Sequence, residues 1–389
     1  MSEGYHVGFT RPAERPPHTG IGRRSGGLLA LVVVLVLATA LLNWIKVDKV
    51  VYSPGPLYDT LGAIDDTSVV QMDEDLETYP TDGQLLFTTI RLAGGPGDPL
   101  TAWSWLKAEL GEATTVVPRE SVFPEGVTAE QVREQNTSLM QHSQEDAAVV
   151  ALRAAGVDVP EKVMVAQVIV GAPADGVLHV DDQIVGVEGD EVTDTESVRS
   201  RLQDVEAGQA ADIEILREGE RVTLEVPTKE DEETGRTIVG VYLAPLYDMP
   251  YDVKVEAGNV GGPSAGLMFA LAIYDTITPG TLTEGKSFAG TGTISGNGSV
   301  GPIGGITQKM YAARQADVQV FLAPAGNCPE VVAGRPDGLT VVPVSTFDEA
   351  EQVVEQVAGA AEVSELELPT CEQVVDRTPE ETEQPVEVP

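Results

Sequence analysis

Ser264 and Lys309 are the two residues of this chain whose sequence surroundings fit bond-breaking chemistry. Ser264 follows Gly261-Gly262-Pro263 and precedes an apolar run, so we expect it at the start of a helix, where backbone N–H groups lack partners and attract negative charge. Lys309 lies on a second predicted helix, with Ile306 and Ala313 on its face. Burial lowers the pKa of a lysine, and a neutral lysine beside a serine is the minimum equipment for acyl transfer.

Each residue taken alone also has an ordinary interpretation. A serine at a helix start usually caps the helix, and a lysine on an apolar face usually extends its ammonium group to water. The functional interpretation depends on both sequence contexts occurring in one chain.

The sequence around both residues resembles the proteolytic domain of the Lon protease family. The resemblance covers roughly residues 239–347 and rests on Pro-Ser-Ala-Gly at 263–266 and on Pro-Ile-Gly-Gly-Ile-x-x-Lys at 302–309. It implies that Ser264 is the nucleophile, Lys309 its general base and Thr291 a support for the lysine. Thr293 stands where the family usually has glutamate, so the acidic residue is absent or supplied elsewhere.

Two further sets of residues complete the expected site. Backbone N–H groups of the turn at 262–264 would hold the oxyanion, with Gly262 and Pro263 shaping that turn. The substrate would contact the residues shortly before this turn, which are Gly258, Asn259 and Val260.

Other site chemistries fit the sequence poorly, and we expect neither a metal nor a cofactor. There is no His-Glu-x-x-His motif, and two cysteines cannot form a zinc cage. A Ser-His-Asp protease would need His142 or His179, neither of which has a motif-like setting. Residues 280–287 fit the P-loop pattern and residues 296–301 a dinucleotide pattern, but neither lies between a predicted strand and a predicted helix.

The N-terminal part predicts a membrane anchor. Residues 25–45 carry no charge and are long enough to span a bilayer, and arginines precede them, which places the N-terminus in the cytoplasm and the body outside. The alternative is a cleaved signal peptide, because Ala38-Thr39-Ala40 resembles a cleavage site. The net charge of −38 argues against nucleic acid as a partner.

A segment before the catalytic region resembles a PDZ domain of the bacterial protease type. The resemblance rests on Gly-Ala-Pro-Ala-Asp-Gly-Val-Leu at 171–178 and on the runs after it, with Asp181-Asp182 in place of the usual Gly-Asp. It implies that an extended peptide binds by adding a strand to a sheet edge. No glycine-rich carboxylate-binding loop precedes Val163, and the alternative is a small β domain that acts as a spacer.

The expected fold is a multidomain α+β and α/β chain. Its parts are a disordered cytoplasmic tail (1–24), a transmembrane helix (25–45), a juxtamembrane α/β region (46–156), a PDZ-like β domain (157–228), a Lon-type α/β proteolytic domain (235–363) and an acidic tail (364–389). Cys328 and Cys371 predict a disulfide if the body lies in an oxidising compartment.

Two functions follow from these features. The first is a membrane-anchored, extracytoplasmic, ATP-independent serine endopeptidase that uses a Ser-Lys dyad and recruits unfolded or flexible protein and peptide substrates through the PDZ-like module. The second is a catalytically inactive peptide-binding scaffold or sensor that keeps the protease fold, for which Thr293 is the sequence argument. The sequence leaves open whether the chain forms an oligomer.

Overall fold

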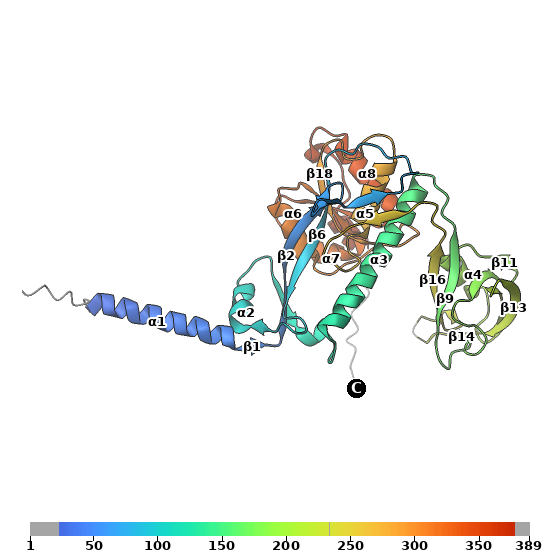
Figure 1. Ribbon diagram of the computed structural model, residues 1–389, viewed down its shortest axis with the longest axis horizontal. Coiled ribbons are helices and arrows are strands. Elements are labelled where there is room, and N and C mark those ends of the chain that lie inside the picture. The colour runs from blue at the N-terminus through green and yellow to red at the C-terminus, as the bar shows by residue number, and fades with distance from the viewer. Residues whose placement is uncertain (1–22, 233, 378–389) are drawn as a thin grey trace, which may run out of the picture. The chain divides into compact units, whose positions relative to one another are not determined.

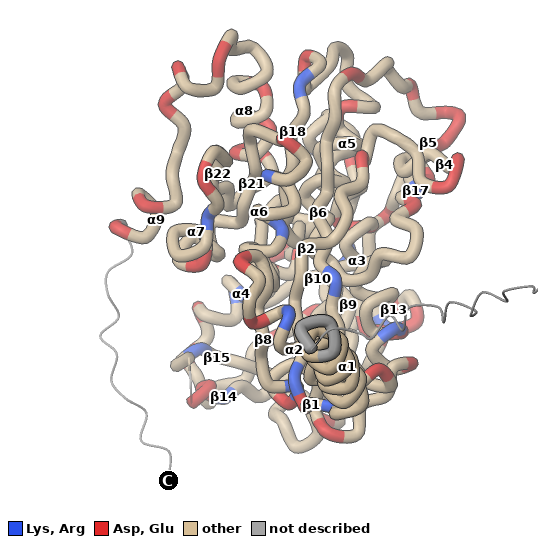
Figure 2. The backbone as a smooth tube through the Cα atoms, turned by 90° about the vertical axis from the view of Figure 1, so that its left-hand side faces the viewer, with Lys and Arg blue, Asp and Glu red and all other residues tan. Residues whose placement is uncertain are grey.

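The computed structural model describes residues 23–232 and 234–377, which separate into two units (Figure 1). The first unit contains residues 23–51 and 93–125, and the second contains residues 52–92 and those from Gly126 onward. Acidic residues occur along the loops and turns of both units, with fewer basic residues among them (Figure 2). The expected N-terminal tail lies outside the described residues, apart from Arg23 and Arg24, which begin a helix.

The first unit consists of one long apolar helix and a small α/β element. Helix α1 (Arg23–Trp44) contains a stretch, Gly27–Trp44, that is long and apolar enough to cross a membrane. Strand β1 (Lys46–Val47) pairs with β7 (Leu100–Thr101), which leads into α2 (Ala102–Glu109). Strand β8 (Thr115–Pro118) pairs with β2 (Lys49–Asp59), and η1 (Arg119–Ser121) follows it.

The second unit is organised around a mostly parallel sheet. Beyond β2, the strand order is β6 (Gln84–Ala93), β18 (Ser287–Gly290), β21 (Val320–Pro324) and β22 (Thr340–Val344), with the last four strands parallel. The short strands β3 (Ala63–Ile64) and β4 (Thr67–Ser68) form a hairpin, and β5 (Val70–Met72) pairs with β17 (Val253–Val255).

Alternating strand residues pack against two layers of helices, because successive side chains of a strand point to opposite faces. Leu85, Phe87 and Leu322 lie in the core that contains α3 (Ala129–Ala154), α5 (Gly266–Ile277) and α8 (Phe347–Ala358). Leu86, Ala289 and Phe321 lie in the core that contains α6 (Ile306–Gln315), α7 (Cys328–Gly334) and α9 (Cys371–Arg377). The short helices η2 (Ala325–Asn327) and η3 (Val363–Glu365) belong to the connections.

The PDZ-like part has its own core and a curled antiparallel sheet. The strand order is β13 (Glu220–Pro227), β12 (Ala210–Arg217), β10 (Gln183–Val187), β9 (Glu161–Val168) and β16 (Val241–Tyr247), with β11 (Asp190–Glu191) beside β10. Helix α4 (Thr195–Gln203) packs beside this sheet, and β14 (Lys229–Glu230) pairs with β15 (Thr237–Ile238). Asp181 takes the left-handed φ of +71° that a glycine usually supplies, and buried Asp182 accepts two hydrogen bonds from Arg217.

Capping and turn residues set the ends of three elements. Asp194 caps α4 together with Ser197, and Thr346 caps α8. The strands β19 (Thr293–Ile294) and β20 (Val300–Gly301) form a hairpin whose loop has five residues, with Gly298 at φ +82°. The loop is therefore a turn followed by a left-handed glycine, and not a two-residue type I′ turn.

The structure divides two expected regions differently from the sequence-based boundaries. The span 46–156 does not form one juxtamembrane region, because β2 and β6 join the parallel sheet and α3 packs against α5. The described part of the expected acidic tail, residues 364–377, is folded onto the catalytic part. Cys371 is fully buried there and forms a disulfide with Cys328, with the two Cα atoms 4.8 Å apart.

Candidate active site

A glycine-rich turn held by α3 presents Ser264 just before α5. Gly262 adopts a left-handed φ of +88°, and its N–H donates to the carbonyl oxygen of Asn136 on α3 at 3.0 Å. Ser143, also on α3, donates its hydroxyl to the carbonyl oxygen of Pro263 at 2.9 Å. Two hydrogen bonds to one long helix therefore fix the chain directly before the serine.

This arrangement changes the expected oxyanion site. The Gly262 N–H already donates to Asn136, and Pro263 has no N–H. The Ser264 N–H has no acceptor within the described residues, and it lies at the entrance to α5. Ser264 itself is thus the better backbone donor of the turn, while Gly262 and Pro263 shape it.

Lys309 reaches Ser264 from α6, which packs on the face of the sheet opposite to α5. Its Nζ lies 2.7 Å from Ser264 Oγ, and it is the only side chain hydrogen-bonded to that oxygen in residues 23–232 and 234–377. Helix α6 begins after Gly305, whose left-handed φ of +73° turns the chain into the helix. Ile306 and Met310 are fully buried beside the lysine.

The surroundings of Lys309 favour its neutral form. The residue is 2% exposed, and burial lowers the pKa of its ammonium group to about 7, because a charged ammonium is poorly solvated there. Burial is the one cause of this shift, with no carboxylate contributing to it. At neutral pH a large fraction of Lys309 can therefore accept a proton.

Thr291 completes a closed set of contacts around the pair. Its Oγ1 lies 2.8 Å from Lys309 Nζ and donates to the carbonyl oxygen of Ser264, also at 2.8 Å. The same carbonyl accepts the Gly292 N–H at 2.8 Å. Thr291 thereby positions the lysine nitrogen and the serine backbone relative to one another.

Thr293 does not replace a missing carboxylate in this arrangement. It lies two residues beyond Thr291 in β19, opposite Gly301 of β20. A Cβ added to Gly301 would stand 2.4 Å from Thr293 Oγ1, so the threonine side chain packs closely over that glycine. Its hydroxyl makes no hydrogen bond to Ser264 or Lys309 in the described part of the chain.

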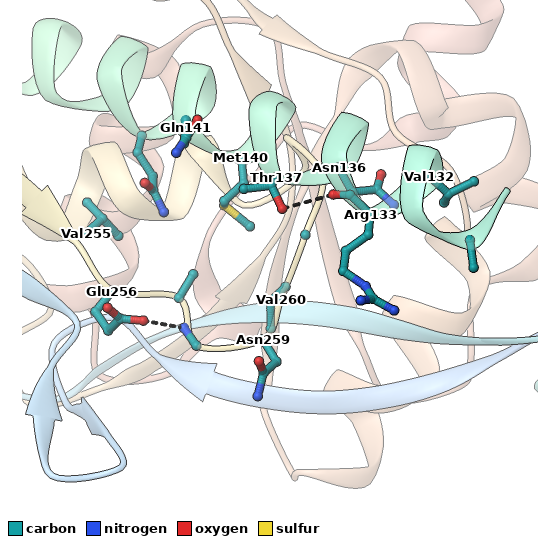
Figure 3. Close-up of a pocket in the computed structure, with 15 residues that line it drawn as sticks. Val132, Arg133, Asn136, Thr137, Met140, Gln141, Val255, Glu256, Asn259 and Val260 are labelled. Carbon is teal, nitrogen blue, oxygen red and sulfur yellow. Dashed lines mark hydrogen bonds between the residues drawn. The ribbon is translucent and has the colours of Figure 1, made fainter.

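A groove of about 640 Å³ lies between α3 and the segment 255–261, which ends three residues before Ser264 (Figure 3). One wall is the first half of α3, including Val132, Asn136 and Met140, and the other is the segment 255–261. The expected substrate residues all lie in that second wall, namely Gly258, Asn259 and Val260. The Gly258 N–H donates to Glu256 Oε1 at 3.0 Å, which curves the wall.

The groove continues beside β17. A second cavity of about 620 Å³ shares Gln141, Gln144, Val255 and Glu256 with the first and extends to Met249. The two cavities together offer a long, open channel in which an extended chain fits better than a compact ligand.

Sequence reasoning missed the contribution of α3. Asn136, Ser143 and Arg133 hold or line the site, yet Ser143 and Ser264 are 121 residues apart in the sequence. The capping box of Thr128 and Gln131 does predict the start of this helix. The sequence carries no signal for which helix face meets the serine.

The PDZ-like part has a free strand edge at β16, which lies within the span 235–363 that the sequence assigned to the proteolytic domain. β16 ends the sheet, and the Gly240 carbonyl and the Asp248 N–H bond towards β9. By alternation, residues 241, 243, 245 and 247 direct their backbone groups away from β9. Pro245 fits this edge, since a missing N–H costs nothing there.

The end of β16 is tied to the catalytic part. The Tyr247 hydroxyl donates to Asp146 at 3.1 Å, and the Arg153 guanidinium lies 5.6 Å from the centre of the Tyr247 ring. Arg153 donates to the carbonyl oxygen of Gly296 in the hairpin that follows Thr291. One helix, α3, therefore contacts the base of the PDZ-like part at one end and the groove at the other.

Comparisons with known proteins identify both parts. Residues 246–357 match the family model of the Lon protease (S16) C-terminal proteolytic domain, and residues 126–228 match that of the PDZ domain. The chain thus carries a PDZ domain followed by a Lon-type proteolytic domain.

Curated relatives that it matches include Lon proteases. Lon protease 1 of Herpetosiphon aurantiacus is 31% identical over 169 residues, which cover 43% of this chain and 20% of the relative. Lon protease 2 of Bacillus subtilis is 36% identical over 102 residues, which cover 25% of this chain and 18% of the relative. The chain spans a fifth or less of the length of these relatives.

The solved structures that match cover about a fifth of this chain. The PDZ domain of an SdrC-like protein from Listeria monocytogenes is 20% identical and covers 21% of this chain and 86% of that structure, with a TM-score of 0.20. A protein from Geobacillus thermodenitrificans is 23% identical and covers 21% of this chain and 94% of that structure, with a TM-score of 0.19.

Proposed function

We propose that this protein is a membrane-anchored serine endopeptidase that works outside the cytoplasm without ATP. The observation that carries the proposal is the 2.7 Å contact between Ser264 Oγ and a buried lysine nitrogen whose pKa lies near neutrality. A nucleophile and a base within hydrogen-bond reach, with a third group orienting the base, is the arrangement that covalent peptide hydrolysis requires.

The proposed reaction uses Lys309 twice. Lys309 Nζ removes the proton of Ser264 Oγ as that oxygen attacks the scissile carbonyl, and the Ser264 N–H donates to the resulting oxyanion. The protonated lysine then gives its proton to the leaving amine, and the acyl-enzyme forms. Water, deprotonated by the now neutral lysine, hydrolyses the acyl-enzyme and returns Ser264 to its starting state.

A covalent serine label tests the proposed activity. A fluorophosphonate should phosphonylate Ser264, because Lys309 activates its hydroxyl, and Ser264→Ala should take up no label. Mass spectrometry of a tryptic digest locates the adduct. A folded protein that stays unlabelled and cleaves no peptide would instead support the inactive peptide-binding scaffold, for which Thr293 is the argument.

Independence from ATP is supported by the setting of the one P-loop-like run. Residues 280–287 follow α5 and lead into strand β18, whereas phosphate binding needs a preceding strand and a following helix. Lys286 donates instead to the carbonyl oxygens of Val357 and Ala360 at the end of α8. The open groove suits substrates that are already unfolded or flexible.

The proposed location is supported by α1 and by the disulfide. A helix of this length and apolarity fits a bilayer span, and the Cys328–Cys371 disulfide fits an oxidising compartment. Protease added to intact cells should therefore digest the body while an N-terminal tag on the same chain survives. Detection of both ends by immunoblotting gives the result, and a protected body would contradict this orientation.

We further propose that the PDZ domain recruits substrate at the free edge of β16. Leu243→Pro removes a backbone N–H that points away from β9, so an added peptide strand loses a hydrogen bond there. Cleavage of an unfolded protein substrate should fall by about tenfold or more, because docking raises the local substrate concentration. Cleavage of a short peptide should change little.

Leu243→Ala is the matched control for this prediction. It removes the side chain but keeps the N–H, so it should retain cleavage of the protein substrate better than the proline variant does. Thermal unfolding shows whether both variants are folded. Equal losses on protein and peptide substrates would indicate a structural role for this strand.

A further inference from the structure

All three tryptophans of the chain belong to the first unit. They are Trp44 at the end of α1 and Trp103 and Trp105 on α2. Trp44 is 83% exposed and Trp105 36% exposed, and neighbouring Leu110 is 80% exposed. Tryptophan is enriched at the membrane–water interface, so the gathering of all three tryptophans in one unit suggests that this unit lies at that interface.

Helix α2 is fixed beside the last turns of α1. The Ala102 N–H donates to the carbonyl oxygen of Ile45 at 2.9 Å, and β1 pairs with β7 directly before α2. Within Gly27–Trp44, Thr39 and Leu42 are the two half-buried residues, and α1 packs against both α2 and β7. At 1.5 Å per residue, these positions lie about 3 to 8 Å before Trp44 along the helix.

This depth places α2 at the edge of any bilayer that α1 spans. The Gly27–Trp44 stretch is about 27 Å long, close to the hydrocarbon thickness of a bilayer, so Thr39 and Leu42 would lie near its outer boundary. A structure packed against them lies in the headgroup region. Interfacial helices there bury an apolar face about 5–10 Å into the headgroup–acyl boundary.

The exposed side of α2 suits that environment. Half-buried Trp103, Leu106 (39% exposed) and the C-cap residue Leu110 follow the i, i+3, i+7 spacing of one helix face. The excess of acidic over basic residues is also smaller in this unit than in the whole chain. Residues 45–51 and 93–125 together contain six acidic residues and four basic ones, which are Lys46, Lys49, Lys107 and Arg119. The whole sequence contains 62 acidic and 24 basic residues.

We propose that α2 is an interfacial helix whose face of Trp103, Leu106 and Leu110 is buried in the lipid headgroup–acyl boundary. The inference rests on the anchor in the proposed function but not on the peptidase activity. It gives the membrane two points of contact with this unit, a spanning helix and a helix lying at the surface.

Depth-dependent quenching in liposomes tests the proposal. The full-length chain is reconstituted in phosphatidylcholine vesicles as a single-tryptophan variant, Trp44→Phe/Trp105→Phe, which leaves Trp103. Lipids brominated near the top of the acyl chain should reduce its emission about as much as that of the Trp44-only variant. Iodide added to the water should quench it little. A chain whose one tryptophan is placed in the PDZ domain by Tyr242→Trp is the control for non-specific quenching.

The outcomes separate this proposal from the anchor. Quenching of Trp44 without quenching of Trp103 would keep the anchor and overturn the interfacial helix. Loss of quenching at both positions would overturn the anchor, whatever the peptidase activity. Protection of Trp103 from both iodide and brominated lipid would mean that protein covers the face, for example a second copy of this chain, which also overturns the proposal.

A charge variant supplies the second measurement. Leu106→Glu/Leu110→Glu in the Trp103-only chain should move Trp103 towards water, with less quenching by brominated lipid and more by iodide, because carboxylates disfavour the boundary. Circular dichroism and peptide cleavage confirm that the chain is folded. Unchanged quenching in this folded variant would contradict burial of the face in lipid.

Discussion

Replacing Lys309 with arginine should lower kcat/KM for peptide cleavage by at least about 1,000-fold. A guanidinium group keeps the positive charge but stays protonated at every working pH, so it cannot accept the Ser264 proton. Ser264→Ala should lose as much activity, and the double variant should be no worse than either single variant, because the two residues act as one unit. Initial rates on a short fluorogenic peptide give the comparison.

Lys286→Ala is the control for this prediction. Lys286 is also held by hydrogen bonds, but to carbonyl oxygens at the end of α8, so its loss should cost stability of about 1–3 kcal/mol and leave peptide cleavage nearly intact. Substantial turnover by folded Lys309→Arg would refute the dyad. Loss of activity in Lys286→Ala alone would revive nucleotide binding at residues 280–287.

The sequence predicts the reacting pair because the signals that position it are local. Proline and glycines before Ser264 specify the turn, and the apolar neighbours of Lys309 specify its burial. Both signals lie within a few residues of the group they control. The 2.7 Å contact between the two side chains follows once their helices pack on one sheet.

The parts that sequence reasoning missed depend on contacts between distant segments. Thr88 of β6 donates to Gly290 of β18 across 202 positions, and no local pattern indicates that β6 belongs to the catalytic sheet rather than to a region of its own. β16 completes the PDZ sheet by pairing with β9, although it follows the stretch of sequence that resembles a PDZ domain. Strand pairing over such distances in the sequence is set by the tertiary fold and not by residue periodicity.

The turn before Ser264 shows the same limit at a single residue. Gly262 has the conformational freedom that the sequence predicts, but its N–H is used by Asn136 on α3. Which N–H groups remain free at a helix start depends on what packs against them, and the residue that does so here lies 126 residues away in the chain.

Peptide cleavage should rise with pH and level off above about pH 8. Only neutral Lys309 can take the Ser264 proton, and its pKa in the folded protein is about 7. Below that value the neutral fraction falls tenfold for each pH unit, so activity at pH 5 should be roughly 1% of the plateau. Rates at saturating and at low substrate concentration, measured from pH 5 to pH 9, give the profile.

The same shift predicts how the stability of the fold depends on pH. The pKa of Lys309 lies below its ordinary value of 10.5, so between about pH 7 and pH 10 the unfolded chain binds more protons than the folded one. The free energy of unfolding should therefore gain a contribution that increases with pH through this window.

Lys309→Met should be inactive and should lack this contribution, because methionine fills the buried site without titrating. Denaturant titrations at pH 7 and pH 9 on both proteins isolate the effect. Activity that is flat from pH 5 to pH 9, or an equal stability gain in Lys309→Met, would show that the buried lysine is not neutral in the resting enzyme.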